Sequence, residues 1–208
     1  SYAALKDTSL MCAACNDLNT VTMSGFSAPL DENMTCMFME SGTSGTPGTA
    51  NLSGADLSAV KSASLMFYGA GYDTVNMYGT KPSALLYADG MFSHMPNLTS
   101  LGPEGLNAWR LTNLKTASYM LSDCPKLTTV NSTDWGMNAC TDMSYMCAND
   151  SVLTLLDMSK WTGGKNIDCI LYNCPVITEA DISKLTGVTN AFMAFAKMPA
   201  LTKLTLPS

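Results

Sequence analysis

One apolar residue recurs along the chain within short stretches in which apolar and polar positions alternate. Such alternation is typical of a β-strand with one buried face. The recurring apolar residues, called strand anchors, are Val21, Ala50, Val75, Leu101, Val130, Leu156, Ala180 and Leu204. Their spacing of 24 to 29 residues is that of leucine-rich repeats, so it predicts about eight copies of one structural unit.

A second apolar pattern precedes these predicted strands. In the stretch 143–150, buried-type positions recur at i, i+3, i+4 and i+7, which places them on one face of a short helix. They are Met143, Met146, Cys147 and Asp150, and the same positions hold Ala117, Met120, Leu121 and Cys124, or Ala88, Met91, Phe92 and Met95. Each copy therefore reads as a short helix, a turn and a short parallel strand. Because such a unit cannot bury its own apolar face, we expect the copies to stack.

The predicted fold class is thus an α/β repeat solenoid of the leucine-rich-repeat type with about eight rungs, forming a single domain over residues 1–208. The Gly/Thr-rich stretch 42–48 reads as a loop insertion. The strand phrase is degraded to "LGPEG" at Leu101 and "VNSTD" at Val130, which predicts irregular rungs there. The sequence opens without Met or the basic start of a signal peptide, so we expect a part of a longer or processed chain.

Five of the eight cysteines fall into two columns of the repeat, and two of these five, Cys12 and Cys147, share a column with Phe38, Phe67, Phe92 and Phe195. Cys15, Cys124 and Cys174 share a column with Met95 and Met198. A thiol that alternates with Met acts as a small apolar side chain. Parallel rungs rise by about 4.8 Å, so Cys124 and Cys174, two rungs apart, would be separated by roughly 10 Å. This exceeds the reach of a disulfide, and we expect all three thiols to be buried and free.

The columns also carry a recognisable consensus. The phrases "VKSASLMFYGAG", "CTDMSYMCAND", "LKTASYMLSDCPKLTTV" and "LLDMSKW" resemble the BspA-like leucine-rich repeats of bacterial surface proteins. The aromatic residue after the strand recurs as Phe26, Trp135 and Trp161. The resemblance covers nearly the whole chain and implies a cell-surface protein that acts in adhesion. It brings no catalytic residue with it.

Composition narrows the classes of partner. The chain carries 11 Lys and Arg against 17 Asp and Glu, for a net charge of −6. A nucleic-acid-binding protein needs a basic face, so we expect no nucleic-acid partner. No apolar run has the roughly 18 residues of a membrane-spanning helix, so we expect no membrane insertion. Hydrophobic residues make up 47% of the chain, which excludes a disordered protein.

Candidate chemical groups are few. "CAAC" (Cys12 to Cys15) has the spacing of a redox pair or of half a zinc site, but no second pair follows, so we expect no metal and no cofactor. His94 reads as an exposed, unpaired side chain. Asp157, Glu179 and Asp181 read as a solvated acidic patch, with a Ca²⁺ site or a carbohydrate-cleaving pair as the alternatives.

The outward polar residues of the strands are the candidate ligand-binding face. They are Thr20, Thr22, Thr49, Asn51, Thr74, Asn76, Thr129, Asn131, Asp157, Glu179 and Asp181. We expect a non-enzymatic recognition or adhesion module, extracellular or at the cell surface, that binds a protein or glycan ligand through this face. The alternative is a virion-associated receptor-binding protein at the virion surface, or a structural assembly protein held by neighbouring chains.

Overall fold

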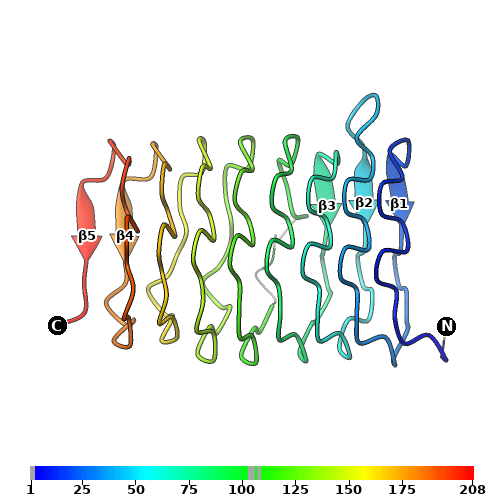
Figure 1. The fold of residues 1–208 in the computed structure, drawn as a ribbon, viewed down its shortest axis with the longest axis horizontal. Helices are drawn as coiled ribbons and strands as arrows, with labels where there is room; N and C mark the ends of the chain where they lie inside the picture. Colours follow the sequence, from blue (N-terminus) through cyan, green and yellow to red (C-terminus); the bar gives the residue numbers. More distant parts are fainter. Residues whose placement is uncertain (1–2, 103–105, 107–108) are drawn as a thin grey trace.

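The chain forms a stack of rungs that runs from the N-terminus at one end to the C-terminus at the other (Figure 1). The computed structural model describes residues 3–102, 106 and 109–208. Five short strands are present in this part: β1 (Thr20–Thr22), β2 (Thr49–Asn51), β3 (Thr74–Asn76), β4 (Glu179–Asp181) and β5 (Lys203–Thr205). They form two parallel sheets, ordered β1-β2-β3 and β4-β5.

The strand anchors stack in register. Val21 pairs with Ala50 and Ala50 with Val75, while Ala180 pairs with Leu204. The anchors from Val21 to Ala180 are buried, as the alternating pattern predicts. Leu204 is 41% exposed, because no following rung of the described chain covers it.

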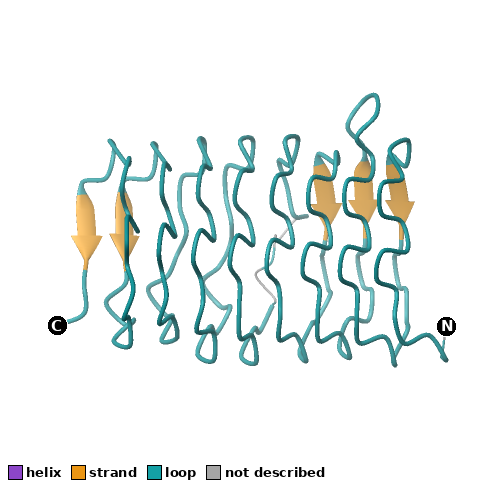
Figure 2. Ribbon diagram, viewed as in Figure 1, coloured by secondary structure: helices purple, strands orange, loops and turns teal. Residues whose placement is uncertain are grey.

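The expected helix in each rung is wrong. No helix occurs among the described residues, and the segment before each strand is a run of overlapping turns (Figure 2). We call this eight-residue segment the turn ribbon; its copies are 8–15, 34–41, 63–70, 88–95, 117–124, 143–150, 167–174 and 191–198. An α/β solenoid of the leucine-rich-repeat type is therefore contradicted, because no rung contributes a helical layer.

Hydrogen bonding explains why the turn ribbon replaces the helix. Within one ribbon the N–H of Met37 donates to the carbonyl of Met34 at 3.2 Å, which closes a turn. The N–H of Phe38 instead donates to the carbonyl of Met66 in the next rung at 2.8 Å. Alternate N–H groups thus close turns and join rungs. In a helix each N–H donates to a carbonyl of the same segment, so no N–H would be left to form hydrogen bonds to a neighbouring rung.

The turn ribbon also requires left-handed backbone at two positions four residues apart. In one rung these are Tyr145 and Asn149, with φ of 56° and 65°. Left-handed backbone costs a residue other than glycine about 1–2 kcal/mol. The hydrogen bonds between rungs offset this cost, each contributing about 0.5–1.5 kcal/mol. The ribbon is consequently a product of stacking rather than of local preference.

Large side chains stack through the core between the two layers of each rung. The Phe38, Phe67 and Phe92 rings form a continuous pile, with centroids 5.2 Å and 5.7 Å apart. The predicted stacking of Phe67 on Phe92 is confirmed. Farther along, Trp135 and Trp161 stack at 5.8 Å, and each indole N–H donates to a main-chain carbonyl of the preceding rung. These aromatic piles pack neighbouring rungs against one another.

Candidate functional site

The strand face carries the predicted ligand-binding residues in two groups. Thr20, Thr22 and Thr49 are exposed on β1 and β2, and Glu179 is exposed on β4. Thr129 and Asn131 are exposed between these groups. The remaining members of the predicted face are half-buried: Asn51, Thr74, Asn76, Asp157 and Asp181. The polar face is therefore partly engaged with the chain itself.

Four of these residues close a turn at the end of a strand or just after a bridge. The Oδ1 atoms of Asn51 and Asn76 accept the N–H of Ser53 and Tyr78 at 3.1 and 3.0 Å. In the same way, Oδ1 of Asp157 and of Asp181 accepts the N–H of Ser159 and of Ser183 at 3.0 and 2.8 Å. Asn and Asp commonly bind the backbone two residues on in this way. The signal in the sequence for three of the four was Asn or Asp followed two positions later by Ser, as in "NLS", "DMS" and "DIS"; Asn76 is followed by Tyr78 instead.

Asp157 is held most firmly of these. Its Oδ1 also accepts the Ser159 hydroxyl at 2.6 Å, and its Oδ2 accepts the Thr133 hydroxyl at 2.8 Å. Burial alone would raise the pKa of Asp157, but the hydrogen bonds from Ser159 and Thr133 outweigh it and hold the pKa below its usual value. Asp157 is therefore a fixed, ionised wall of the strand face at neutral pH.

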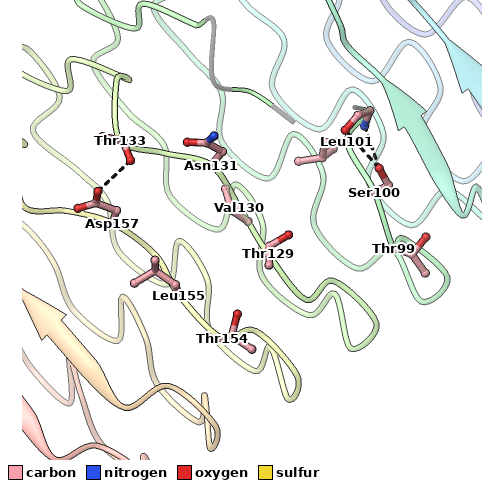
Figure 3. Close-up of a pocket in the computed structure, with 11 residues that line it drawn as sticks. Thr99, Ser100, Leu101, Thr129, Val130, Asn131, Thr133, Thr154, Leu155 and Asp157 are labelled. Carbon is pink, nitrogen blue, oxygen red and sulfur yellow. Dashed lines mark hydrogen bonds between the residues drawn. The ribbon is translucent and has the colours of Figure 1, made fainter. Parts of the chain in front are cut away.

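A groove of about 440 Å³, which we call the strand groove, lies beside Asp157 (Figure 3). It is lined by Thr99, Ser100, Leu101, Gly102, Thr129, Val130, Asn131, Thr133, Thr154, Leu155 and Asp157. Figure 3 shows the side chains of Thr129 and Asn131 between those of Ser100 and Asp157. Hydroxyl, amide and carboxylate groups thus surround this hollow.

The strand groove lies where the strand pairing is interrupted. A bridge joins Thr74 with Ser100, and another joins Val130 with Leu156. No bridge joins Leu101 with Val130 among the described residues. The degraded strand phrases at these two anchors predicted such an irregularity. The alternation of apolar and polar residues gave no reason to place Thr99, Thr133 or Thr154 in a binding site. Their positions depend on how the rungs of Leu101 and Val130 separate. Pro103 and Gly105, within the longer step, lie outside the described residues.

The predicted acidic patch of Asp157, Glu179 and Asp181, which we call the acidic end, also contains a basic group. Lys203 Nζ lies 3.0 Å from Glu179 Oε2, and this hydrogen bond raises the pKa of Lys203. The backbone N–H of Ser183 lowers the pKa of Asp181. A small hollow of about 180 Å³ is lined by residues that include Asp157, Glu179 and Lys203. The carboxylates are engaged by donors of the chain itself, an arrangement unlike the two convergent, differently tuned acids of a glycosidase.

The predicted thiol and imidazole sites differ in part from expectation. Cys124 and Cys174 are buried and free, as predicted, and their thiols donate to the carbonyls of Phe92 and Cys147 at 3.0 and 2.9 Å. Burial raises the pKa of Cys174 to about 12, which keeps this thiol protonated. Cys15 is free but exposed, so its predicted burial is wrong; it belongs to the first turn ribbon, at the end of the stack.

The surroundings of Cys12 and His94 differ from those of a redox pair and of an unpaired imidazole. Burial raises the pKa of Cys12, whereas a reactive redox thiol needs a lowered one. His94 is exposed as predicted, but it is not unpaired: its Nδ1 lies 2.7 Å from the Ser93 hydroxyl, and its ring packs on Tyr68. Across the described ranges, no group of three or more His, Cys, Asp or Glu side chains is placed to hold a metal ion. Within the same ranges, no helix has the length and apolar character to cross a membrane.

Comparison with known proteins gives one family. The model described as "Mycoplasma protein of unknown function, DUF285" matches residues 32–161 and, in an overlapping second match, 88–200. Two shifted matches of one model are what a repeating chain produces. No curated protein and no solved structure matches the chain.

Proposed function

This chain belongs to the family described as Mycoplasma protein of unknown function, DUF285, and we propose that it is a non-enzymatic recognition module. Its ligand would be a protein or glycan of a cell surface, bound through the strand face. The family is related to the BspA-like repeats of surface proteins, which supports a place outside the cell or on its surface. A location on a virion remains the alternative form of the same proposal.

The observation that carries the proposal is the strand groove. Its rim combines hydroxyls from Thr99, Thr129 and Thr154 with the amide of Asn131. Side chains of this kind both donate and accept hydrogen bonds, as peptide backbones and sugar hydroxyls require. The groove lies between two rungs whose pairing is interrupted. A segment of extended ligand laid across it would replace the bridge that is absent between Leu101 and Val130.

The chemistry of the groove favours binding over catalysis. Its one carboxylate, Asp157, already accepts hydrogen bonds from Ser159 and Thr133 on both oxygens. A general acid or base needs a proton that it can exchange with substrate, held at a pKa near neutrality. The pKa of Asp157 is lowered instead, so this group serves as a fixed hydrogen-bond acceptor.

The proposal is tested by blocking the strand groove. In Thr129→Arg a long side chain replaces a small exposed one in the lining of the groove, and in Asn131→Ala the amide is lost. Binding of the wild type and both variants to arrayed cell-surface proteins and glycans is measured at equal concentration. We expect Thr129→Arg to abolish binding and Asn131→Ala to weaken it about tenfold, the effect of losing about 1.4 kcal/mol.

The matched control is Thr20→Arg, which changes the exposed threonine at the same position before the strand anchor of β1. Equal loss of binding in Thr20→Arg and Thr129→Arg would show that added positive charge, rather than a blocked groove, is responsible. Full binding by Thr129→Arg would move the site away from the groove and contradict the proposal.

An assembly part is the second candidate, favoured by the apolar side chains of the last described rung. Phe192 is 69% exposed and Leu206 is 58% exposed. Such groups are commonly covered in an interface. Light scattering across a concentration series, on the wild type and on Phe192→Ser, separates a recognition module from an assembly part. An assembly part would form oligomers that dissociate in the Phe192→Ser variant.

A further inference from the structure

A second groove lies on the turn ribbons rather than on the strands. We call it the turn groove; it has a volume of about 450 Å³. Its lining consists of Ser64, Leu65, Tyr68, Asp89, Gly90, Ser93, His94, Ser118 and Tyr119. Aromatic rings, hydroxyls and one carboxylate meet here, whereas the strand groove has no aromatic side chain. The two grooves share no lining residue, and they therefore can be tested separately.

One wall of the turn groove is a braced aromatic ring. Leu65, Gly90, Tyr119 and Tyr145 occupy the same position in successive turn ribbons, each with a positive φ. The Tyr119 ring stacks on the Tyr145 ring with centroids 4.6 Å apart and planes 3° from parallel. The neighbour on the other side, Gly90, has no side chain. The face of Tyr119 turned away from Tyr145 is therefore open to a ligand, and Tyr119 is 43% exposed.

The position of Leu65 limits this opening from the far side. A Cβ atom added at Gly90 would lie 2.7 Å from Cδ2 of Leu65, so the leucine side chain reaches over the glycine. Glycine is needed here for space; its φ of 59° does not require glycine, because Leu65 and Tyr119 adopt a similar φ at the same position. The result is a slot with the Gly90 backbone as its floor, an aliphatic wall at Leu65 and an aromatic wall at Tyr119.

Polar groups with fixed orientation border the slot. Asp89 Oδ1 accepts the Ser118 N–H at 3.0 Å and the Ser118 hydroxyl at 2.7 Å, while Oδ2 accepts the Thr116 hydroxyl at 2.5 Å. One lone pair of Oδ2 is left over for a further donor. The Nδ1 atom of His94 is engaged by Ser93, so Nε2 is the imidazole nitrogen without a partner among the described residues. These atoms present an acceptor and a second polar group beside the open ring face.

From this arrangement we propose that the turn groove binds one hexopyranose residue of a neutral glycan. The C–H face of the sugar would lie on Tyr119, and its hydroxyls would reach Asp89 Oδ2 and His94 Nε2. A sugar ring is apolar on its faces and polar around its edge, which matches an aromatic wall bordered by hydrogen-bonding groups. A phenyl ring in the same slot would give Asp89 Oδ2 and His94 Nε2 no hydrogen-bond partner. An anion would be repelled by Asp89.

The test uses saturation-transfer NMR with free disaccharides: maltose, cellobiose, lactose and N,N′-diacetylchitobiose, with choline chloride as a cationic comparison. We expect at least one disaccharide to receive saturation through its ring C–H protons. Tyr119→Ala should weaken its binding at least about fivefold, because a buried aromatic contact is lost. Tyr145→Ala should weaken it less, since Tyr145 braces Tyr119 without lining the groove.

Two controls make the result specific. Tyr87→Ala removes another exposed tyrosine, 46% exposed and outside the turn groove, and should leave sugar binding unchanged. Thr129→Arg blocks the strand groove and should also leave it unchanged, so the two sites succeed or fail separately. Melting temperatures close to that of the wild type establish that each variant is folded.

Three outcomes would overturn the assignment. Absence of transfer to all four sugars would show that the groove binds none of these hexopyranosides. Transfer that persists in Tyr119→Ala would place the sugar elsewhere. Binding of choline in place of the disaccharides would identify an aromatic and carboxylate cage for a quaternary ammonium group.

Discussion

At the scale of single residues, Asp150 departs most from its surroundings. It is fully buried, at the turn-ribbon position that Cys124 and Cys174 occupy in the adjacent rungs. Its Oδ1 accepts the N–H of Cys124 at 2.8 Å, but Oδ2 has no hydrogen-bond partner within the described chain. Burial raises the pKa of Asp150 well above its usual value; the Cys124 N–H opposes this rise, and the Asp123 charge adds to it. The helix-face pattern treated Asp150 as a buried position, and it gave no indication of this shift.

The raised pKa makes a prediction about pH. In the unfolded chain Asp150 titrates near its ordinary pKa of about 3.9. Because the folded pKa is higher, its stabilising contribution is fully present below the unfolded pKa and is lost as pH rises through the folded pKa. Asp150→Asn keeps an acceptor for the Cys124 N–H but cannot ionise. We expect the variant to gain stability relative to the wild type as pH rises from 4 upward.

Urea unfolding of both proteins at several pH values measures this difference. Asp17→Asn, which removes an exposed carboxylate near the N-terminal end of the stack, is the control for a general loss of negative charge. A difference between Asp150→Asn and the wild type that stays constant over the whole pH range would mean that Asp150 titrates normally.

At the scale of the element, several strands end where an Asn or Asp side chain accepts a backbone N–H and closes a turn. Each three-residue strand from β2 to β4 finishes with Asn or Asp, whose Oδ1 turns back to the second following N–H. Asp157 does the same after the bridge at Leu156. The residues predicted as the ligand-binding face are thus divided between turn closure and solvent. Exposure alone makes Thr129, Asn131 and Glu179 better candidates for contact than Asp157.

Substitutions at the acidic end distinguish turn closure from mere exposure. Asp157→Ala removes three hydrogen bonds to a partly buried carboxylate, so we expect it to lower the free energy of unfolding by about 1–3 kcal/mol. Asp157→Asn retains the acceptor for Ser159 and should cost less. Glu179→Gln breaks only an exposed ion pair with Lys203 and should change stability by at most about 1 kcal/mol. Chemical denaturation ranks the three, and an equal cost for Glu179→Gln and Asp157→Ala would refute the turn-closing role.

At the scale of the whole molecule, stability depends on each rung having a neighbour on both sides. Phe67 lies between Phe38 and Phe92 and is fully buried. Phe195 occupies the same column in the last turn ribbon and is only half-buried. A solenoid-like stack of this kind sums its stability over such nearest-neighbour contacts. Interior positions should therefore be far more sensitive than terminal ones, although the residue type is the same.

Truncation of the two phenylalanines measures this dependence. We expect Phe67→Ala to cost about 3–5 kcal/mol, the usual penalty for truncating a buried aromatic side chain. Phe195→Ala should cost clearly less, because within the described residues a rung packs against it on one side and none on the other. Thermal and urea unfolding provide both values. A loss below about 1 kcal/mol for Phe67→Ala would mean that the register of the aromatic pile is wrong.

The sequence by itself determined the repeat, its register and the buried columns of the interior rungs, but not the exposure of Cys15 in the first rung. Apolar residues recur in columns because each rung must present the same face to the next, so the burial of Ala117, Met120 and Met143 was predictable. It did not determine the conformation between them. Positions i, i+3, i+4 and i+7 are shared by a helix of 3.6 residues per turn and by a ribbon that repeats every four residues. Over eight residues the two periods drift apart too little to distinguish.

Only the tertiary structure decided between them, through hydrogen bonds that no single rung can make. The N–H of Phe38 needs the carbonyl of Met66, and Tyr145 accepts a left-handed backbone because its neighbours on both sides do. The candidate sites have the same origin. The strand groove exists because two rungs are not bridged at Leu101 and Val130, and the turn groove exists because glycine at position 90 precedes Tyr119 in one column. Such features arise from contacts between residues 24 to 32 positions apart, which a local pattern cannot contain.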